Sequence, residues 1–455
     1  MVALDPTPYS VPMHAPQADH PTDAAEPTIA ELIAARPHLS MHAMDGLVMD
    51  GVPLARVADA LGTPAWVYSA GVMRSRYRAL AGALDGLGTR IHYAVKANDH
   101  LAVLRVFAAE GAGADVVSGG ELLRALAAGI PPGRVVFSGV GKSAAELRLA
   151  LERGIGQVNV ESAEELDMLS GIAAAMGRTA RIALRVNPDV EAGTHAKIST
   201  GRARDKFGIP YRDTAALYSR AAGLPGIAPA GLAVHIGSQI LSVAPYRAAF
   251  GRLAELAHGL RAGGHSIETV DCGGGLGIGY RDEPVASPAA LAGAIRATLG
   301  GLGLKLVVEP GRWLVGPAGV LLASVVLVKR SEGTRFVVLD AAMNDLVRPA
   351  MYDAWHAVVP LSAVDAARPA TPADIVGPVC ETGDTFARDR ALPPLAPHAR
   401  VAILDAGAYG AVMSSTYNAR PLAAAAMVAD GEWATIRARQ PVEALWAGEH
   451  VPNWV

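Results

Sequence analysis

Between about residue 88 and residue 312, one pattern recurs eight times: a short β-branched run, a turn residue, and then a stretch rich in Ala, Leu, Glu and Arg with helical spacing. Apolar runs of this length, separated by helices, are typical of buried parallel strands joined by crossover helices. Eight such units predict a closed (β/α)₈ barrel in which the first and last strands meet. The predicted strands are Ile91–Ala97, Ala114–Ser118, Val135–Gly139, Gln157–Ser162, Ile182–Asn187, Leu232–Ser238, Thr269–Gly273 and Leu304–Glu309.

The chain changes character after Arg312. Strand-like runs separated by Pro, Gly and Asp turns predict a separate β-rich domain with Greek-key-like topology, and the segment from Leu47 to Ser69 is expected to add a strand or two to it. The runs are Val320–Val328, Arg335–Leu339, Arg400–Leu404, Met427–Val428 and Trp433–Ile436. The expected division is a flexible N-terminal extension at 1–40, a β-domain segment at 41–69, the barrel at 70–315 and the β-rich domain at 316–455.

Composition and charge narrow the classes of function. Hydrophobic residues make up 51% of the 455 residues and charged residues 18%, which supplies a large core and argues against general disorder. The formal net charge of −3 creates no field that would attract nucleic acid or a membrane surface, and no apolar stretch is long enough to cross a bilayer. The two cysteines form no disulfide framework. These features predict a cytoplasmic protein that acts on a small molecule.

Each predicted barrel strand ends in or beside a chemically capable side chain or a glycine turn. Active sites of such barrels lie at the carboxyl ends of the strands, so we expect these groups to converge on one mouth. They are Lys96, Asp115, Ser118, Ser138, Glu161, Arg185, His235, Ser238, Gly273, Gly274, Gly275, Glu309 and Arg312.

Lys96 lies in the apolar run HYAVKAN at the end of the first predicted strand. Burial disfavours the charged form of a lysine, so we expect a lowered pKa and a neutral amine that is able to form a Schiff base. The alternative is a lysine that reaches solvent or pairs with Asp115. His235 also has two interpretations, because it either stacks flat on a cofactor ring or is a hydrogen-bonded core histidine.

The glycine triplet at 273–275 follows the seventh predicted strand, where bare backbone N–H groups can approach a phosphate, with Ser238 as a further donor. A simple tight turn is the alternative. Ile278 stands where a dinucleotide-binding fingerprint needs glycine, and Val136 stands where an ATPase phosphate loop needs one. Nicotinamide enzymes and P-loop NTPases are therefore disfavoured.

The eighth predicted strand closes with Glu309 and Arg312, three positions apart. A carboxylate that faces a pyridine nitrogen keeps the ring protonated and electron-withdrawing, which favours chemistry through a carbanion. The alternative is a salt bridge between Glu309 and a neighbouring arginine.

Cysteine and anion-binding candidates lie in the β-rich part. Cys380 stands among turn formers, where a thiol of ordinary pKa is mostly protonated and can deliver a proton to a carbanion. A small buried hydrophobe is the alternative for Cys380 and the preferred interpretation of Cys272. Arg348 with Tyr352, four residues later, and Tyr409 each either contact an anion or decorate the surface.

As a set, the motifs resemble those of the diaminopimelate decarboxylase family, alanine-racemase-like enzymes of fold type III that use pyridoxal 5′-phosphate. The resemblance runs in order from about residue 42 to the end of the chain. The motifs are YAVKAN, DVVSGGEL, VFSGVGKS, NVES, RVNPDV, THAKISTG, KFGI, HIGSQ, DCGGGLGI, EPGR, RPAMY, CETGD and DAGAYG.

The resemblance implies a role for each candidate residue, and no metal. Lys96 would carry the cofactor covalently, with His235 stacked on the ring and Glu309 at the pyridine nitrogen. The remaining cofactor contacts would be Asp115, Ser238, Gly273, Gly274, Gly275, Gly311, Arg312 and Tyr409. The substrate would be bound by Arg312, Arg348, Tyr352, Glu381 and Tyr409. Cys380 would be the proton donor and would come, with Glu381, from the partner subunit of a homodimer.

The implied reaction converts meso-2,6-diaminopimelate to L-lysine and CO₂ at its D-centre, as the last step of lysine biosynthesis. Arg312, Arg348 and Glu381 supply both signs of charge, which suits a substrate with an ammonium and a carboxylate at its far end. The alternatives are a related decarboxylase for carboxynorspermidine, arginine or ornithine, and a non-catalytic pyridoxal phosphate-binding protein. Glu309 disfavours a racemase, which would place an arginine there.

Overall fold

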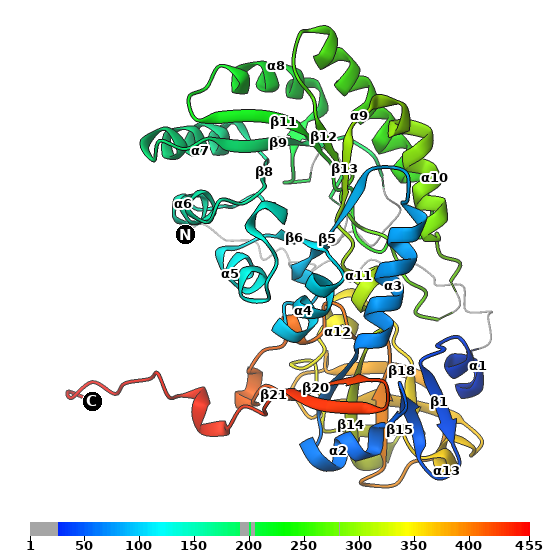
Figure 1. Ribbon diagram of the computed structural model, residues 1–455. Helices are drawn as coiled ribbons and strands as arrows, with labels where there is room; N and C mark the ends of the chain where they lie inside the picture. The colour runs from blue at the N-terminus through cyan, green and yellow to red at the C-terminus, as the bar shows by residue number, and fades with distance from the viewer. Residues whose placement is uncertain (1–25, 192–199, 202–204, 282) are drawn as a thin grey trace, which may run out of the picture.

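The computed structural model describes residues 26–191, 200–201, 205–281 and 283–455. Eight parallel strands form a closed barrel, which confirms the predicted fold; β13 pairs with β5, and β8 pairs with β9 (Figure 1). The barrel strands are β5 (Thr89–Ala94), β6 (Gly113–Val116), β7 (Val135–Phe137), β8 (Gln157–Val160), β9 (Ala180–Asn187), β11 (Ile227–Ala233), β12 (Thr269–Asp271) and β13 (Lys305–Val308), with the short β10 (Ile209–Pro210) added beside β9.

Helices follow the barrel strands, and serine residues begin several of them. The hydroxyls of Ser118, Ser143 and Ser162 each accept the N–H of a glutamate three residues later, which satisfies an otherwise free donor at the helix start. The helices around the barrel are α3 (Ala70–Ala83), α4 (Leu101–Ala109), α5 (Gly119–Ala127), α6 (Ala144–Arg153), α7 (Ala163–Ala175), α8 (Tyr211–Ala222), α9 (Ala244–Ala262), α10 (Pro288–Leu299) and α11 (Arg312–Val315). None of the helices among the described residues is long and apolar enough to span a membrane.

The β-rich domain lies below the barrel in Figure 1. Its strands are β4 (Ala65–Ser69), β14 (Gly319–Ser331), β15 (Thr334–Leu339), β16 (Val358–Pro360), β17 (Thr371–Val376), β18 (Thr385–Leu392), β19 (Arg400–Ile403), β20 (Ala424–Ala429) and β21 (Glu432–Arg437). β4 lies between β14 and β20, so the segment before the barrel contributes a strand to the interior of this sheet. Two short helices, α12 (Arg348–Tyr352) and α13 (Ala363–Ala366), lie between its strands.

Residues 26–40, which the sequence placed in a flexible extension, contain helix α1 (Ile29–Ala34) and the start of β1 (Leu39–His42). β1 pairs with β2 (Gly46–Met49), which also pairs with β3 (Val52–Pro53), and helix α2 (Leu54–Leu61) follows. Arg36, directly after α1, forms a buried ion pair with Asp405 of the β domain. Residues 1–25 and most of the THAKISTG motif lie outside the described residues.

Lys142 is a buried cation in the connection from β7 to α6, and it links this connection to strand β8 and helix α7. Its ammonium donates to the carbonyl oxygens of Gly139 and Asn159 and to the carboxylate of Glu165, at 2.7–2.8 Å. Neither partner of the ion pair has significant exposure, with 0% of the Lys142 side chain and 7% of the Glu165 side chain accessible. The pair therefore depends on mutual neutralisation rather than on solvent.

We predict that Lys142→Met destabilises the protein by about 3–5 kcal/mol, because Glu165 is then left buried without a counter-charge. Arg78→Met is the matched control, since Arg78 pairs with Glu110 on the surface and such pairs contribute little. Urea unfolding of the two variants measures the difference. Equal losses in both variants would show that burial of the Lys142 pair is irrelevant to stability.

Candidate active site

Lys96 stands where β5 ends, in a single 3₁₀ turn over Val95–Ala97 that follows Ala94. Its ammonium donates a 2.7 Å hydrogen bond to Asp115 of the neighbouring strand β6, whose side chain is completely buried. The Lys96 side chain keeps 30% of its surface exposed. Of the two interpretations of Lys96, the structure thus shows the pair with Asp115, and it leaves the amine accessible from the barrel mouth.

The expected lowering of the Lys96 pKa is wrong for the protein without cofactor. Burial does lower the pKa of Lys96, but the negative charges of Asp115 and Glu309 raise it by more, so the net shift is upward. The sequence indicated the burial of the lysine, but it did not show a carboxylate 2.7 Å away. The amine is therefore held as an ammonium by Asp115.

Glu309 follows β13 and meets Asp271, the last residue of β12. The two carboxyl groups share a hydrogen bond, and no ion pair joins Glu309 to any arginine among the described residues, so the salt-bridge alternative is wrong. Burial, followed by the charges of Asp115 and Asp271, raises the pKa of Glu309 well above its ordinary value. One proton is therefore retained between the two acids.

The polar atoms left without partners fit the cofactor that the sequence implied. Oε1 of Glu309 is buried and has no hydrogen-bond partner, and neither has Oδ1 of Asp115. Buried acceptors of this kind are costly unless a donor satisfies them. A pyridine nitrogen bearing a proton is such a donor, so the acid at Glu309 fits a pyridoxal ring above the barrel mouth.

The glycine triplet is needed for close backbone packing. A Cβ on Gly273 would stand 2.1 Å from the carbonyl oxygen of Val234, and one on Gly274 would stand 2.0 Å from that of Glu309. The N–H of Gly273 donates to Asp271, and that of Gly274 donates to Nδ1 of His235. Two of the three expected phosphate donors are thus already used inside the protein, which supports the tight-turn alternative for them.

His235 lies beside this turn, at the end of the strand run that contains β11. Burial, together with the positive charges of Lys96 and Arg185, lowers the pKa of His235 well below its ordinary value. The imidazole is therefore neutral. A neutral, flat ring that accepts the Gly274 N–H through one nitrogen is compatible with stacking on a cofactor.

Two buried arginines line the side of the site that faces the β domain. Arg312 donates to the hydroxyl of Tyr280 at 2.6 Å and to Oγ of Ser238 at 3.1 Å. Arg348, at the start of α12, approaches Nε2 of His356 to 2.6 Å, and it lies over the ring of Tyr280. The Nε group of each arginine is buried without a partner, and neither arginine forms an ion pair within the described residues. The site therefore holds two positive charges available to anions.

The tyrosines and the Cys380–Glu381 pair have different positions. Tyr409 reaches the site, because its backbone N–H donates to the carbonyl of Ala97 and its ring lies 4.8 Å from the guanidinium carbon of Arg312. Tyr352 ends α12, one turn after Arg348. Cys380 and Glu381 are exposed in the loop between β17 and β18, where the backbone N–H of Cys380 donates to Asn418. Among the described residues, no hydrogen bond or ion pair joins this pair to Lys96 of the same chain.

The sequence alone missed three residues that hold the site together: Asp271, Tyr280 and His356. Asp271 had a visible signal, because it ends a barrel strand directly before the glycine triplet. Tyr280 and His356 act through contacts with arginines far away in the sequence, which no local pattern indicates. Cys272 is a buried core residue, as predicted, and burial raises its pKa well above the ordinary value.

Comparison with known proteins decides the family. Residues 71–316 match the family described as pyridoxal-dependent decarboxylase, pyridoxal binding domain. The diaminopimelate decarboxylase of Zymomonas mobilis is 49% identical over 414 residues, which cover 90% of this chain and 98% of that protein. The chain belongs to the diaminopimelate decarboxylase family. The resemblance drawn from the motifs is thereby confirmed, as is the expectation of a decarboxylase that uses pyridoxal phosphate.

Solved structures agree with this assignment. A diaminopimelate decarboxylase from Helicobacter pylori complexed with L-lysine superposes with a TM-score of 0.84 at 39% identity, and the match covers 86% of this chain and 98% of that one. Another from M. jannaschii in co-complex with L-lysine gives a TM-score of 0.86 at 33% identity, covering 92% and 98%. The barrel and the β-rich domain are therefore the architecture of the family.

The raised pKa of Glu309 predicts a pH dependence of stability in the cofactor-free protein. A carboxyl whose pKa is higher in the folded state stabilises the fold fully below its unfolded pKa, and this contribution is lost as pH rises through the folded value. Glu309→Gln should therefore flatten the decline of unfolding free energy above the ordinary pKa of glutamate. Urea unfolding at a series of pH values measures the slope.

Glu146→Gln is the control for this slope. Hydrogen bonds from the backbone of Gly119 and Ser143 lower the pKa of Glu146, so its contribution is lost as pH falls, which is the opposite direction. If Glu309→Gln and wild type decline in parallel, the shared proton between Glu309 and Asp271 is refuted.

Proposed function

We propose that this chain decarboxylates meso-2,6-diaminopimelate at its D-centre and releases L-lysine and CO₂, the last step of lysine biosynthesis. The observation that carries the proposal is the pair of buried arginines, Arg312 and Arg348, which have no ion-pair partner within the described residues, with Arg312 over the ring of Tyr409. A substrate with a carboxylate at each end uses two such cations, whereas lysine, ornithine and arginine carry only one carboxylate. An analogue without the distal carboxylate leaves an arginine buried and unpaired, which costs about 1–3 kcal/mol or more.

The residues around Lys96 suit covalent attachment of the cofactor. When bound, pyridoxal phosphate supplies a ring that withdraws electrons from the carbon that loses CO₂. Asp115 holds the Lys96 amine by its 2.7 Å hydrogen bond, and its negative charge compensates positive charge at that nitrogen. The unpartnered Oε1 of Glu309 would accept from the ring nitrogen, and His235 would cover one face of the ring as a neutral imidazole.

Phosphate binding is assigned to the groups that remain available. Ser238 accepts from Arg312 through its oxygen, so its own hydrogen is free to donate. Gly275, Gly311 and Arg312 contribute backbone N–H groups that make no hydrogen bond to the described part of the chain. Together with Tyr409, these groups are the hydrogen-bond donors that we assign to the phosphate. The N–H groups of Gly273 and Gly274, which the resemblance implied, are already used inside the protein.

The distal end of the substrate meets residues of both charges. Arg312, Arg348 and Tyr352 bind carboxylate groups, and Tyr280 keeps both guanidinium groups oriented through its hydroxyl and its ring face. His356 fixes Arg348: its Nδ1 faces the carbonyl of Leu404, which leaves Nε2 as the acceptor toward the arginine. Glu381 binds the distal ammonium.

We assign the proton donor to Cys380 of a second copy of this chain. Cys380 and Glu381 are exposed, Glu381 accepts a hydrogen bond from Tyr417, and neither acts on Lys96 of the same chain. A head-to-tail exchange within a homodimer would bring this loop over the partner's barrel mouth. The Cys380 thiol then delivers its proton to the carbon that lost CO₂ and is re-protonated from solvent. The absence of a strong net charge and of a disulfide framework is compatible with a cytoplasmic enzyme that has no nucleic-acid partner.

Substrate choice is tested with the purified, cofactor-loaded protein. Incubation in parallel with meso-diaminopimelate, lysine, ornithine, arginine and carboxynorspermidine should release CO₂ from meso-diaminopimelate alone, with L-lysine as the chiral product. Arg348→Ala should raise KM for meso-diaminopimelate while the visible absorption of the bound cofactor stays unchanged. Turnover of ornithine or arginine instead would overturn the two-carboxylate assignment, and no turnover with cofactor bound would favour a binding protein.

Shared active sites are tested by mixing two inactive variants. Lys96→Ala and Cys380→Ala subunits, co-expressed with different tags and isolated as hybrids, should regain about half of the wild-type activity, because one of the two sites in each hybrid dimer is complete. Hybrids of Cys380→Ala with Glu381→Gln are the control and should remain impaired, since no site in them is complete. Hybrids of the first pair without activity would contradict the exchange of this loop.

A further inference from the structure

A second cavity of about 520 Å³ lies outside the proposed active site, where the end of α1, the first turns of α3 and the loop after β12 meet. Its wall includes Arg36, His38, Arg76, Ile278 and Asp405. The proposed chemistry of this enzyme uses none of these residues. The cavity is therefore a separate candidate for binding.

Arg76 is the one side chain of this wall that is fixed in place and yet lacks a counter-charge among the described residues. Its Nε donates to the carbonyl oxygen of Trp313, and its guanidinium carbon lies 4.0 Å from the centre of the Trp313 ring. Its two terminal amino groups make no hydrogen bond, and no carboxylate forms an ion pair with it, within the residues that the structure describes. Burial lowers the pKa of Arg76 to about 10, so it still carries its charge at neutral pH.

The neighbouring groups that the structure describes form no ion pair with Arg76. The charge of Asp405 opposes the lowering of the Arg76 pKa, but its carboxylate is paired with Arg36, which also donates to the carbonyl oxygens of Leu32 and Tyr280. Burial and the charges of Arg36 and Arg76 lower the pKa of His38 to about 4, so this imidazole is neutral, and its Nε2 is buried without a partner. Asp50, which also lines the cavity, accepts a hydrogen bond from Ser69.

We propose that this cavity binds a small oxyanion, a phosphate or carboxylate group, on the terminal amino groups of Arg76. A planar guanidinium with both amino groups unused matches the spacing of two oxygens on such an anion. The ring of Trp313 and the bond to its carbonyl hold the guanidinium in one orientation before the anion arrives, which reduces the entropy lost on binding. The volume leaves room for a molecule larger than the anionic group itself.

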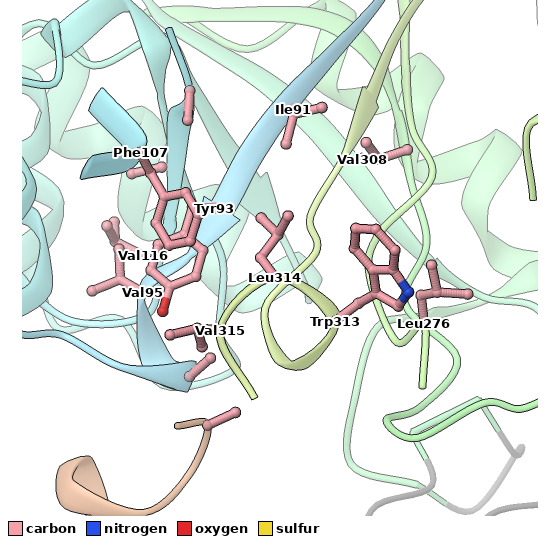
Figure 2. Packing of buried hydrophobic residues seen from close by; sticks show 14 of the residues in the cluster. Ile91, Tyr93, Val95, Phe107, Val116, Leu276, Val308, Trp313, Leu314 and Val315 are labelled. Carbon is pink, nitrogen blue, oxygen red and sulfur yellow. The ribbon is translucent and has the colours of Figure 1, made fainter. Parts of the chain in front are cut away.

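Two residues of the cavity wall, Arg36 and Arg76, hydrogen-bond to neighbours of Arg312. Trp313 follows Arg312 in α11, and Figure 2 shows its ring beside Leu276 and near Val308. Arg36 reaches the same region from the cavity side, because it donates to the carbonyl of Tyr280, whose hydroxyl accepts from Arg312. The anion site is therefore linked through Trp313 and Tyr280 to an arginine assigned to the substrate.

Binding is tested by titrating the holoenzyme, saturated with cofactor, with inorganic phosphate in one arm and with succinate in another, by calorimetry. Wild type and Arg74→Ala, the control two residues earlier on α3, should bind the same anion equally, and Arg76→Ala should bind it at least tenfold more weakly. The arm with the tighter binding identifies the source as phosphate or carboxylate. Equal affinity in Arg76→Ala and wild type would overturn the proposal.

A second measurement uses only the wild-type protein, so it does not depend on whether a variant folds. Crystals of the wild-type holoenzyme soaked in selenate should show anomalous scattering beside Arg76, in the cavity. Anomalous scattering confined to other places would overturn the proposal. A dissociation constant above about 10 mM in both titrations would also overturn it, because it would indicate an adventitious ion only.

Discussion

Three buried carboxyl groups around a single lysine are the constraint on which the site depends. Asp115 and Asp271 lie in β6 and β12, and Glu309 directly follows β13. The closed barrel brings the C-terminal ends of these strands to one mouth. So many acids in a dry environment cannot all be ionised at once. The protein distributes the charge by pairing Asp115 with Lys96 and by keeping a proton between Asp271 and Glu309. The result is one charged amine near two buried carboxyl oxygens, Oδ1 of Asp115 and Oε1 of Glu309, that still lack a donor.

The other half of the site has an excess of positive charge. Arg312 and Arg348 are buried with Tyr280 between them, and their Nε groups have no partner. Structures rarely leave such donors unsatisfied unless a ligand completes them. A substrate that is both an acid and an amine at each end matches a site with acids on one side and arginines on the other, and the β domain supplies Arg348 to complete it.

The sequence predicted the barrel well because each of its strands is buried on both faces and is therefore a continuous apolar run. It missed β16 because that strand is only three residues long, and it missed β17 and β18 because their Pro, Thr, Asp and Arg side chains interrupt the apolar runs. The positions of Lys96, Glu309 and Arg312 followed from strand ends. The pKa of Lys96 did not, because its direction depends on a 2.7 Å contact with Asp115 that only the fold creates.

Cofactor attachment at Lys96, held by Asp115, is the step on which the proposed chemistry depends. Borohydride reduction of the holoenzyme fixes the bond between cofactor and lysine, and mass spectrometry of the digested protein then locates the label. We expect a label on Lys96 alone among the six lysines of the chain. A label on any other lysine, with Lys96 unmodified, would contradict it.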